Sequence, residues 1–324
     1  MIHSFMQSIL VVVAFTFLCC RPVEKPAVQA NTTIQNNNPP ATRVLDSSMI
    51  ISELQFLSSD TCEGRKYGSK GHELAAQTII QNLKNSKARH FNNSFEQGFT
   101  TESFNISKEG KNIIAYVKGK KYADSFIVIS AHYDHLGRNA DSAIYHGADD
   151  NASGVACLQA LVKYFAKHPQ QYTIVFAFFD NEETGLLGAK YFVTNLPKGV
   201  TKENIKLNVN LDMVARSDQN EMYVCGLRHY PQFSKAVHSV QNKTTVNLLV
   251  GHDSGSFRED WTNQSDHYAF HKQNIPFLYI GVEDHADYHH ITDTFDKVNL
   301  HSYIENCNLI AMLVKELCVG NYEL

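Results

Sequence analysis

This chain of 324 residues lacks several features that mark particular classes of protein. There is no excess of basic residues: the formal net charge is −4 at pH 7, which excludes the electrostatic footprint of a nucleic-acid-binding protein. There is no CxxC motif, so the spacing of the seven cysteines assigns no disulfide. There is no internal repeat, and beyond the first twenty residues no apolar run is long enough to span a membrane.

The N-terminal segment has the character of an export signal. Ile9–Cys20 is an apolar run of twelve residues, which is shorter than a membrane-spanning helix and typical of a signal-peptide core. No Lys or Arg precedes it. The run ends in Cys19 and Cys20 before a polar stretch and so resembles a bacterial lipoprotein signal, although Phe17 and Leu18 stand where small residues are usual.

Residues 1–20 are therefore predicted to be a signal peptide or lipoprotein signal, residues 21–45 a disordered linker, and residues 46–324 one folded domain. The expected location is the periplasm or outer membrane of a bacterium, or the outside of the cell. A lipidated Cys19 or Cys20 would add a membrane tether. The alternative is an uncleaved anchor, which also places the domain outside the cytoplasm.

The rest of the chain alternates apolar strands with amphipathic helices. The expected strands are 112–119, 125–130, 172–179, 206–214 and 275–282. The expected helices are 47–58, 71–85, 155–168, 185–196, 231–242 and 303–318. Strands that are apolar throughout predict an α/β fold, with a mainly parallel, mixed central sheet between helices on both faces.

Histidines and acidic residues follow these strands. They are His132 and Asp134, Asp149 and Asp150, Glu182 and Glu183, Asp212, and Tyr288, His289, His290 and Asp293. Functional groups in such folds lie beyond the carboxyl ends of the strands, so we expect these side chains to meet. Imidazole and carboxylate ligands suit zinc, and two ions that share a carboxylate suit hydrolysis.

The adjacent glutamates Glu182 and Glu183 gain a rationale from such a site. Like charges repel, and a metal ion offsets the repulsion. One glutamate would bind metal, and the other would act as the general base beside it.

The order of these motifs resembles the co-catalytic zinc aminopeptidases. The motifs are HxD, GADDNASG, EE, an Asp after NL, and YH followed by Asp four residues later. The stretches LSSDTCEGRKYGSKGHELAA and SDHYAFHKQNIPFLYIG are also similar to segments of that family. The resemblance covers residues 50–318. The family includes bacterial leucyl aminopeptidases, glutamate carboxypeptidase II and glutaminyl cyclase.

The resemblance implies two Zn²⁺ ions per chain. One would be bound by His132 and Asp212 and the other by Glu183 and His289, with Asp150 bridging both. Asp150 is favoured over Asp149 because it directly precedes the N-x-S-G stretch. His289 is favoured over His290 because it follows Tyr288 and precedes Asp293 by four residues.

Further roles follow from the same resemblance. Glu182 would be the general base and Tyr288 an oxyanion donor. Asp134 would orient His132 by a hydrogen bond, and Asp293 would do the same near His289. Other histidines near these motifs are expected to line the mouth of the site without binding metal: His135, His146, His252, His267, His271 and His285.

The predicted function is an exported di-zinc aminopeptidase that removes N-terminal residues from peptides with a free N-terminus. One alternative is a glutaminyl cyclase-like transferase that uses a single zinc. The other is a catalytically silent binding domain of the same fold. The related carboxypeptidase and deacylase group is disfavoured, because the segment between Asp212 and His289 has no room for its lid domain.

Overall fold

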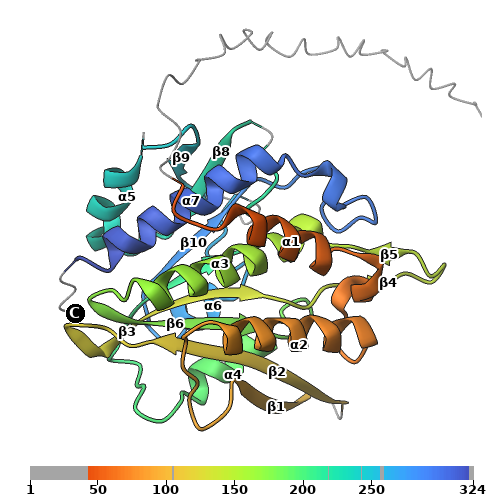
Figure 1. Ribbon diagram of the computed structural model, residues 1–324, viewed down its shortest axis with the longest axis horizontal. Helices are drawn as coiled ribbons and strands as arrows, with labels where there is room; N and C mark the ends of the chain where they lie inside the picture. Colours follow the sequence, from red (N-terminus) through yellow and green to blue (C-terminus); the bar gives the residue numbers. More distant parts are fainter. Residues whose placement is uncertain (1–42, 104–105, 218, 242, 256–258, 321–324) are drawn as a thin grey trace, which may run out of the picture. The chain divides into compact units, whose positions relative to one another are not determined.

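The computed structural model describes residues 43–320 except 104–105, 218, 242 and 256–258 (Figure 1). The predicted signal at 1–20, and the predicted linker as far as residue 42, lie outside the described residues. Among the described helices, none has the length and apolar character needed to cross a membrane.

An eight-stranded sheet forms the centre of the fold, in the order β1-β2-β6-β3-β7-β10-β8-β9. Its strands are β1 (Glu96–Ser103), β2 (Ile106–Val117), β3 (Tyr122–His132), β6 (Tyr172–Phe179), β7 (Ile205–Leu211), β8 (Glu221–Cys225), β9 (Asn247–Val250) and β10 (Phe277–Gly281). The pairs β6/β3, β3/β7, β7/β10 and β8/β9 are parallel, whereas β1/β2, β2/β6 and β10/β8 are antiparallel. The predicted mainly parallel, mixed sheet is confirmed.

Helices cover both faces of this sheet (Figure 1). They are α1 (Ser47–Leu57), α2 (Lys70–Asn85), α3 (Gly154–Lys167), α4 (Leu187–Thr194), α5 (Ser234–Val240), α6 (His267–His271) and α7 (Leu300–Leu317). Side chains of β6 alternate between the faces, as the pleat of a strand requires. Ile174 and Phe176 pack in the core with α1, α2, α3, α5 and α7, while Val175 and Ala177 pack with α4 and α6.

The elements that sequence patterns did not predict lie mainly at the two edges of the sheet. β1 reads EQGFTTES and lacks an apolar run, while β8 and β9 are short. The predicted helix at 231–242 is a 3₁₀ turn at Pro231–Phe233 followed by α5. A two-stranded hairpin, β4 (Gly137–Arg138) and β5 (Ile144–Tyr145), carries the loop before residue 146.

The five cysteines in the described part of the chain are free and buried: Cys62, Cys157, Cys225, Cys307 and Cys318. Cys157 in α3 and Cys307 in α7 are part of the hydrophobic core.

The central parallel strands place the predicted site residues together. β6, β3, β7 and β10 are neighbours and point the same way, so the segments that follow them meet at one edge of the sheet. His132 ends β3, Asp212 follows β7, and Glu182 and Glu183 come shortly after β6.

Candidate metal centre

Two groups of ligand atoms share the carboxylate of Asp150. Oδ1 of Asp150 lies 3.4 Å from Nε2 of His132. The same Nε2 lies 3.2 Å from Oδ1 of Asp212. Oδ2 of Asp150 lies 3.0 Å from Nε2 of His289, which is 3.4 Å from Oε2 of Glu183. Each oxygen of Asp150 thus faces a different imidazole, which is the arrangement of a carboxylate that bridges two cations.

These groups fit zinc in donor type and in spacing. Four ligands at about 2.0–2.2 Å around a tetrahedral ion lie about 3.3–3.6 Å from one another, close to the separations found here. The buried Oδ2 of Asp150 makes no hydrogen bond with the described residues, although Nε2 of His289 lies only 3.0 Å away. A buried oxygen without a hydrogen bond is costly, and a cation would satisfy it.

Backbone amides fix Asp149 and leave Asp150 for the ligand position. The carboxylate of Asp149 accepts hydrogen bonds from the backbone N–H of Ala215 at 2.7 Å and of Arg216 at 3.3 Å. Asp149 therefore ties the turn Ala148–Ser153 to the segment after Asp212. This geometry supports the choice of Asp150 over its neighbour.

Asp293 differs from expectation. Its carboxylate accepts the backbone N–H of Asp149 at 3.0 Å and of Asp150 at 3.2 Å. The prediction that it orients His289 is wrong, because its hydrogen bonds go to the turn that carries the bridging carboxylate.

Asp134 contacts His132, as expected, but through its backbone carbonyl and not through its carboxylate. Nδ1 of His132 contacts the backbone carbonyl of Asp134 at 3.2 Å, while the nearer carboxylate oxygen of Asp134 is 3.8 Å from that nitrogen. The carboxylate instead accepts the backbone N–H of Glu182 at 3.0 Å and of Glu183 at 3.4 Å. The backbone of Asp134 orients His132, and its side chain positions the glutamate pair.

Glu182 lies on the side of the first group, among other acids. Burial raises the pKa of Glu182 well above its usual range, and the charges of Asp266 and Asp212 add to the increase. Asp212 is held in turn by Ser265, whose hydroxyl donates to Oδ2 at 2.6 Å. A bound cation would counter this concentration of negative charge and allow Glu182 to ionise.

Nearby carboxylates raise the pKa values of both candidate ligand histidines, His132 and His289. Burial opposes protonation of His132, but the neighbouring Asp212 and Glu182 outweigh it and raise the pKa of His132 well above its usual range. Close polar contacts with Asp150 and Glu183 raise the pKa of His289 to about 10. A metal ion at this centre would therefore compete with protons for the two imidazoles.

Sequence comparison identifies the family. Residues 112–314, more than half of the chain, match Peptidase family M28. The chain belongs to this family. The resemblance that the ordered motifs indicated is therefore confirmed.

Individual relatives match the chain over part of their length. Aminopeptidase YwaD of Bacillus subtilis is 30% identical over 172 residues, which cover 52% of this chain and 35% of YwaD. A probable zinc metalloprotease of Pyrenophora tritici-repentis is 33% identical over 150 residues, which cover 44% of this chain and 33% of that protein. The chain spans about a third of the length of these curated relatives.

Solved structures share the fold at low sequence identity. A glutaminyl cyclase of Porphyromonas gingivalis has a TM-score of 0.68 at 18% identity, over 85% of this chain and 99% of that one. An aminopeptidase of Aneurinibacillus sp. strain AM-1 has a TM-score of 0.65 at 16% identity, over 85% and 94%. These similarities extend the M28 fold over most of the chain and do not choose between the two activities.

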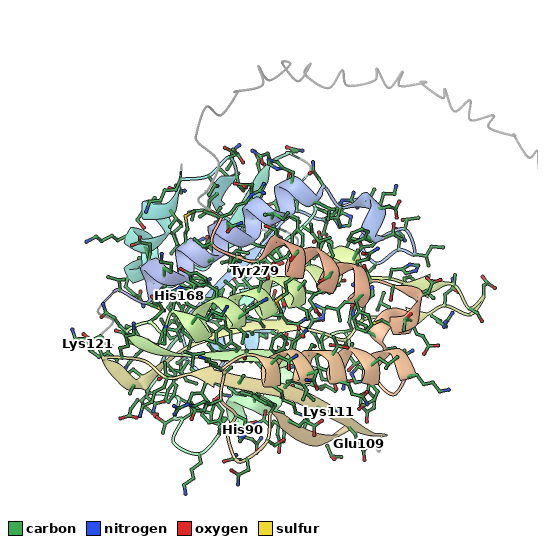
Figure 2. The ribbon with its side chains drawn as sticks, viewed as in Figure 1. His90, Glu109, Lys111, Lys121, His168 and Tyr279 are labelled. Atoms are coloured by element: carbon green, nitrogen blue, oxygen red, sulfur yellow. The ribbon has the colours of Figure 1, made fainter. Side chains whose placement is uncertain are left out.

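Two cavities flank the centre of this M28 domain. The first, of about 40 Å³, is lined by His132, Asp150, Glu182, Asp212, Met213, Trp261, Gln264, Tyr279, Val282, Asp284, Tyr288 and His289. Tyr279 on β10 (Figure 2) donates its hydroxyl to the backbone carbonyl of Asp212 at 3.0 Å. The second, of about 610 Å³, is lined by Lys66, Tyr67, Glu109, Asp134, His135, Leu136, Asn181, Glu183 and Thr184.

Tyr288 lines the first cavity and stacks on His289, with the ring centroids 4.0 Å apart. Burial raises the pKa of Tyr288, so its phenol keeps its proton and remains a hydrogen-bond donor.

Arg65 is a positioning residue that sequence reasoning missed. Its side chain is fully buried, and its N–H groups donate to five backbone carbonyls, those of Tyr133, Leu57, His146, Gly147 and Asp150, at 2.6–3.3 Å. The guanidinium thus joins the loop after His132 to the turn that carries Asp150. Arg65 lies in the stretch LSSDTCEGRKYGSKGHELAA, but the sequence does not reveal that its side chain is buried.

His135 is the second residue whose role the sequence did not reveal. The sequence prediction placed it at the mouth of the site, yet Nδ1 of its buried ring lies 2.6 Å from Oε1 of Glu183. Two other histidines that were expected near the mouth have partners outside both groups: Nε2 of His146 contacts Asp60 at 2.9 Å, and that of His267 contacts the carbonyl of Trp261 at 2.9 Å. Nε2 of His285 lies 3.3 Å from Oδ2 of Asp149, next to Asp150.

Proposed function

We propose that the chain is a zinc-dependent aminopeptidase that binds two metal ions and hydrolyses the N-terminal residue from peptides. The proposal rests on the carboxylate of Asp150, which presents one oxygen to His132 and the other to His289. Glu182 lines the same cavity and is not one of the proposed metal ligands. His132, Asp150 and Asp212 would hold one zinc, and Asp150, Glu183 and His289 would hold the other. Bound zinc would supply Lewis-acid chemistry, polarising the scissile carbonyl and lowering the pKa of water.

The chain's own residues would move the proton. Glu182 lines the narrow cavity together with the first group, so its carboxylate can take a proton from the attacking water and give it to the leaving amine. Asp134 fixes the backbone of Glu182, which keeps the base in place through both transfers. The protonated phenol of Tyr288 would donate a hydrogen bond to the oxyanion.

The shapes of the two cavities support removal of a terminal residue. The narrow cavity is lined by Asp150, Asp212 and Asp284, whose negative charge suits the α-amine of a free N-terminus. The wide cavity borders Glu183 on the other side and would accommodate the chain beyond the scissile bond. N-acetylation removes the positive charge of the amine and adds bulk on the narrow side.

A glutaminyl cyclase-like activity is the second candidate. It is favoured by the likeness to the Porphyromonas gingivalis enzyme, and it also requires an N-terminal residue in the narrow cavity. The two activities differ in what attacks: water in the peptidase, and the substrate's own α-amine in the cyclase. The complete set of two histidines and three carboxylates, with Glu182 as an extra acid, favours the peptidase.

One substrate panel tests both candidates. The chain is loaded with zinc and assayed on leucyl- and alanyl-anilides, on their N-acetyl forms, and on peptides that begin with Gln, with products identified by mass spectrometry. We expect cleavage of the free forms and little cleavage of the acetylated forms. Equal rates on free and acetylated anilides would contradict the aminopeptidase. Loss of ammonia from N-terminal Gln without hydrolysis would assign the cyclase.

We also propose that the enzyme is exported, as a periplasmic or outer-membrane lipoprotein or as a secreted protein. The support is the apolar run Ile9–Cys20 and the polar stretch that follows it. Palmitate labelling of the full-length chain and of a Cys19→Ser, Cys20→Ser double variant tests the tether. Equal labelling of both would contradict lipidation, and a full-length chain that stays in the cytoplasm would contradict export.

A further inference from the structure

We propose that His135 is a fourth protein ligand of the second metal ion, in addition to Asp150, Glu183 and His289. The proposal rests on the two-metal part of the proposed function, but it does not depend on the substrate. It makes the two sites unequal: one would be filled by four protein ligands, and the other would keep an open position beside Glu182.

The position of the ring carries the proposal. Nδ1 of His135 lies 3.6 Å from Oδ2 of Asp150, which is the spacing of two ligands of one zinc ion. It lies 2.6 Å from Oε1 of Glu183, which is a hydrogen-bond distance and shorter than that spacing. The ligand atoms of these three residues all lie within 4.8 Å of one another, as do those of His132, Asp150 and Asp212. Glu183 directs one oxygen to each imidazole, Oε1 to His135 and Oε2 to His289.

The fold buries the imidazole of His135 and packs it closely at this position. His135 lines the wide cavity, but its side chain is only 1% exposed, so contact with solvent does not explain the orientation of its ring. The ring packs on Gly147, where a Cβ would lie 2.4 Å from Cδ2 of His135. Nε2 of the ring makes no hydrogen bond with the described residues, so Glu183 and Asp150 are the contacts that explain the orientation of the ring.

The ligand count has a functional consequence. Zinc sites with four protein ligands are closed and structural, whereas catalytic sites have three and leave one position for water or substrate. The second site would have two imidazoles and two carboxylates. The first would have His132, Asp150 and Asp212, next to the narrow cavity and Glu182. We therefore infer that the second site holds its ion more tightly and that the first site is the exchangeable, catalytic one.

The competing explanation is a hydrogen bond from Nδ1–H of His135 to Glu183, with no bond to metal. Substitution of His135 by asparagine distinguishes the two explanations. The amide nitrogen of asparagine stands close to the position of Nδ1 and can donate the same hydrogen bond. An amide is, however, a far weaker zinc ligand than an imidazole. The variants are His135→Asn and His135→Ala. The matched control is His290→Asn, which removes an exposed histidine next to His289.

The experiment measures the metal ligands directly. X-ray absorption of the fully loaded wild-type chain counts imidazoles per two zinc ions, and a chelator competition measures the affinity of the tighter ion in each variant. We expect three imidazoles in the wild type, and a loss of affinity above about 100-fold in both His135 variants, because an outer-shell partner alone costs about 10- to 100-fold. The control should match the wild type.

Two results would overturn the inference. Two imidazoles per two zinc ions would exclude His135 from the metal, and so would a His135→Asn variant that keeps the wild-type affinity. The wild-type count does not depend on whether a variant folds. A wild-type chain that binds fewer than two ions would instead contradict the two-metal proposal itself, so the two failures are distinguishable.

Discussion

The carboxylate of Asp134 accepts the backbone N–H of Glu182 at 3.0 Å. A second hydrogen bond reaches it from the backbone of Glu183 at 3.4 Å. Glu182 and Glu183, the proposed base and the proposed ligand, are thus held by a residue that follows β3, two residues beyond His132. Because β3 and β6 are neighbouring parallel strands, the loop after one fixes the loop after the other, and the sheet sets the position of Glu182 relative to His132.

Removal of the Asp134 carboxylate should impair turnover more than metal binding. In Asp134→Ala, the backbone of Glu182 loses its acceptor and the base is less well placed, so kcat should fall about 10- to 100-fold, the usual cost of an outer-shell partner. Metal analysis should still find the wild-type zinc content. Asp141→Ala, at an exposed position, is the control. An unchanged kcat would show that Glu182 is positioned without Asp134.

Substitution of each paired glutamate should separate the base from the ligand. Glu182→Gln keeps size and polarity but cannot accept a proton, so kcat should fall about 100- to 10,000-fold with both metals retained. Glu183→Gln should weaken one metal site, because a neutral amide replaces a charged ligand. Zinc content after dialysis, measured together with kcat, distinguishes the two variants. The opposite pattern would reverse the assignment of base and ligand.

Sequence patterns predicted the central strands, and placed the candidate metal ligands beyond their ends, for a physical reason. β3, β6, β7 and β10 are buried on both faces, so each is an uninterrupted apolar run that stands out from its surroundings. Polar residues that follow such runs meet at one edge of a parallel sheet, which is where functional groups gather in folds of this class. The edge strand β1 has no such run and escaped prediction.

The supporting residues could not be predicted because tertiary contacts decide their partners. Asp293 lies four positions from His289, yet it accepts hydrogen bonds from the backbone of Asp149 and Asp150, far away in the sequence. Arg65 is likewise distant from the turn that it holds. His135 occurs near the HxD motif like any loop residue, and only the path of the chain beside Gly147 turns its ring inward.

Loss of the Arg65 guanidinium should destabilise the domain. Arg65→Met would remove a donor from five carbonyls, of which that of Gly147 still accepts the backbone N–H of Ala152. Each buried carbonyl left without a partner costs about 1–3 kcal/mol, so the free energy of unfolding should fall by about 3 kcal/mol or more. Arg65→Lys should recover little, because an ammonium lacks the planar fork of donors. Urea unfolding of the zinc-loaded chain measures the change.

Arg138→Met is the matched control for Arg65. Its side chain is 42% exposed and pairs with Glu63 at 3.3 Å, so its loss should cost no more than about 1 kcal/mol. Equal unfolding free energies for the Arg65 and Arg138 variants would contradict the role assigned to Arg65.

Metal binding should release protons and strengthen as the pH rises. In the metal-free protein, the pKa of His132 is well above its usual range and that of His289 is about 10, so both imidazoles are protonated at pH 7. Each must lose its proton before its Nε2 can bind zinc, so protons compete with the metal and the apparent affinity falls as the pH falls. Calorimetric zinc titration at pH 7 in buffers of different ionisation enthalpy should detect at least two protons released per two zinc ions, and the affinity should rise between pH 6 and pH 8. In His132→Ala the release should fall by about one proton. A titration with no dependence on the buffer would mean that both histidines are already neutral, and the charges of Asp150, Asp212 and Glu183 would then have to be offset in another way.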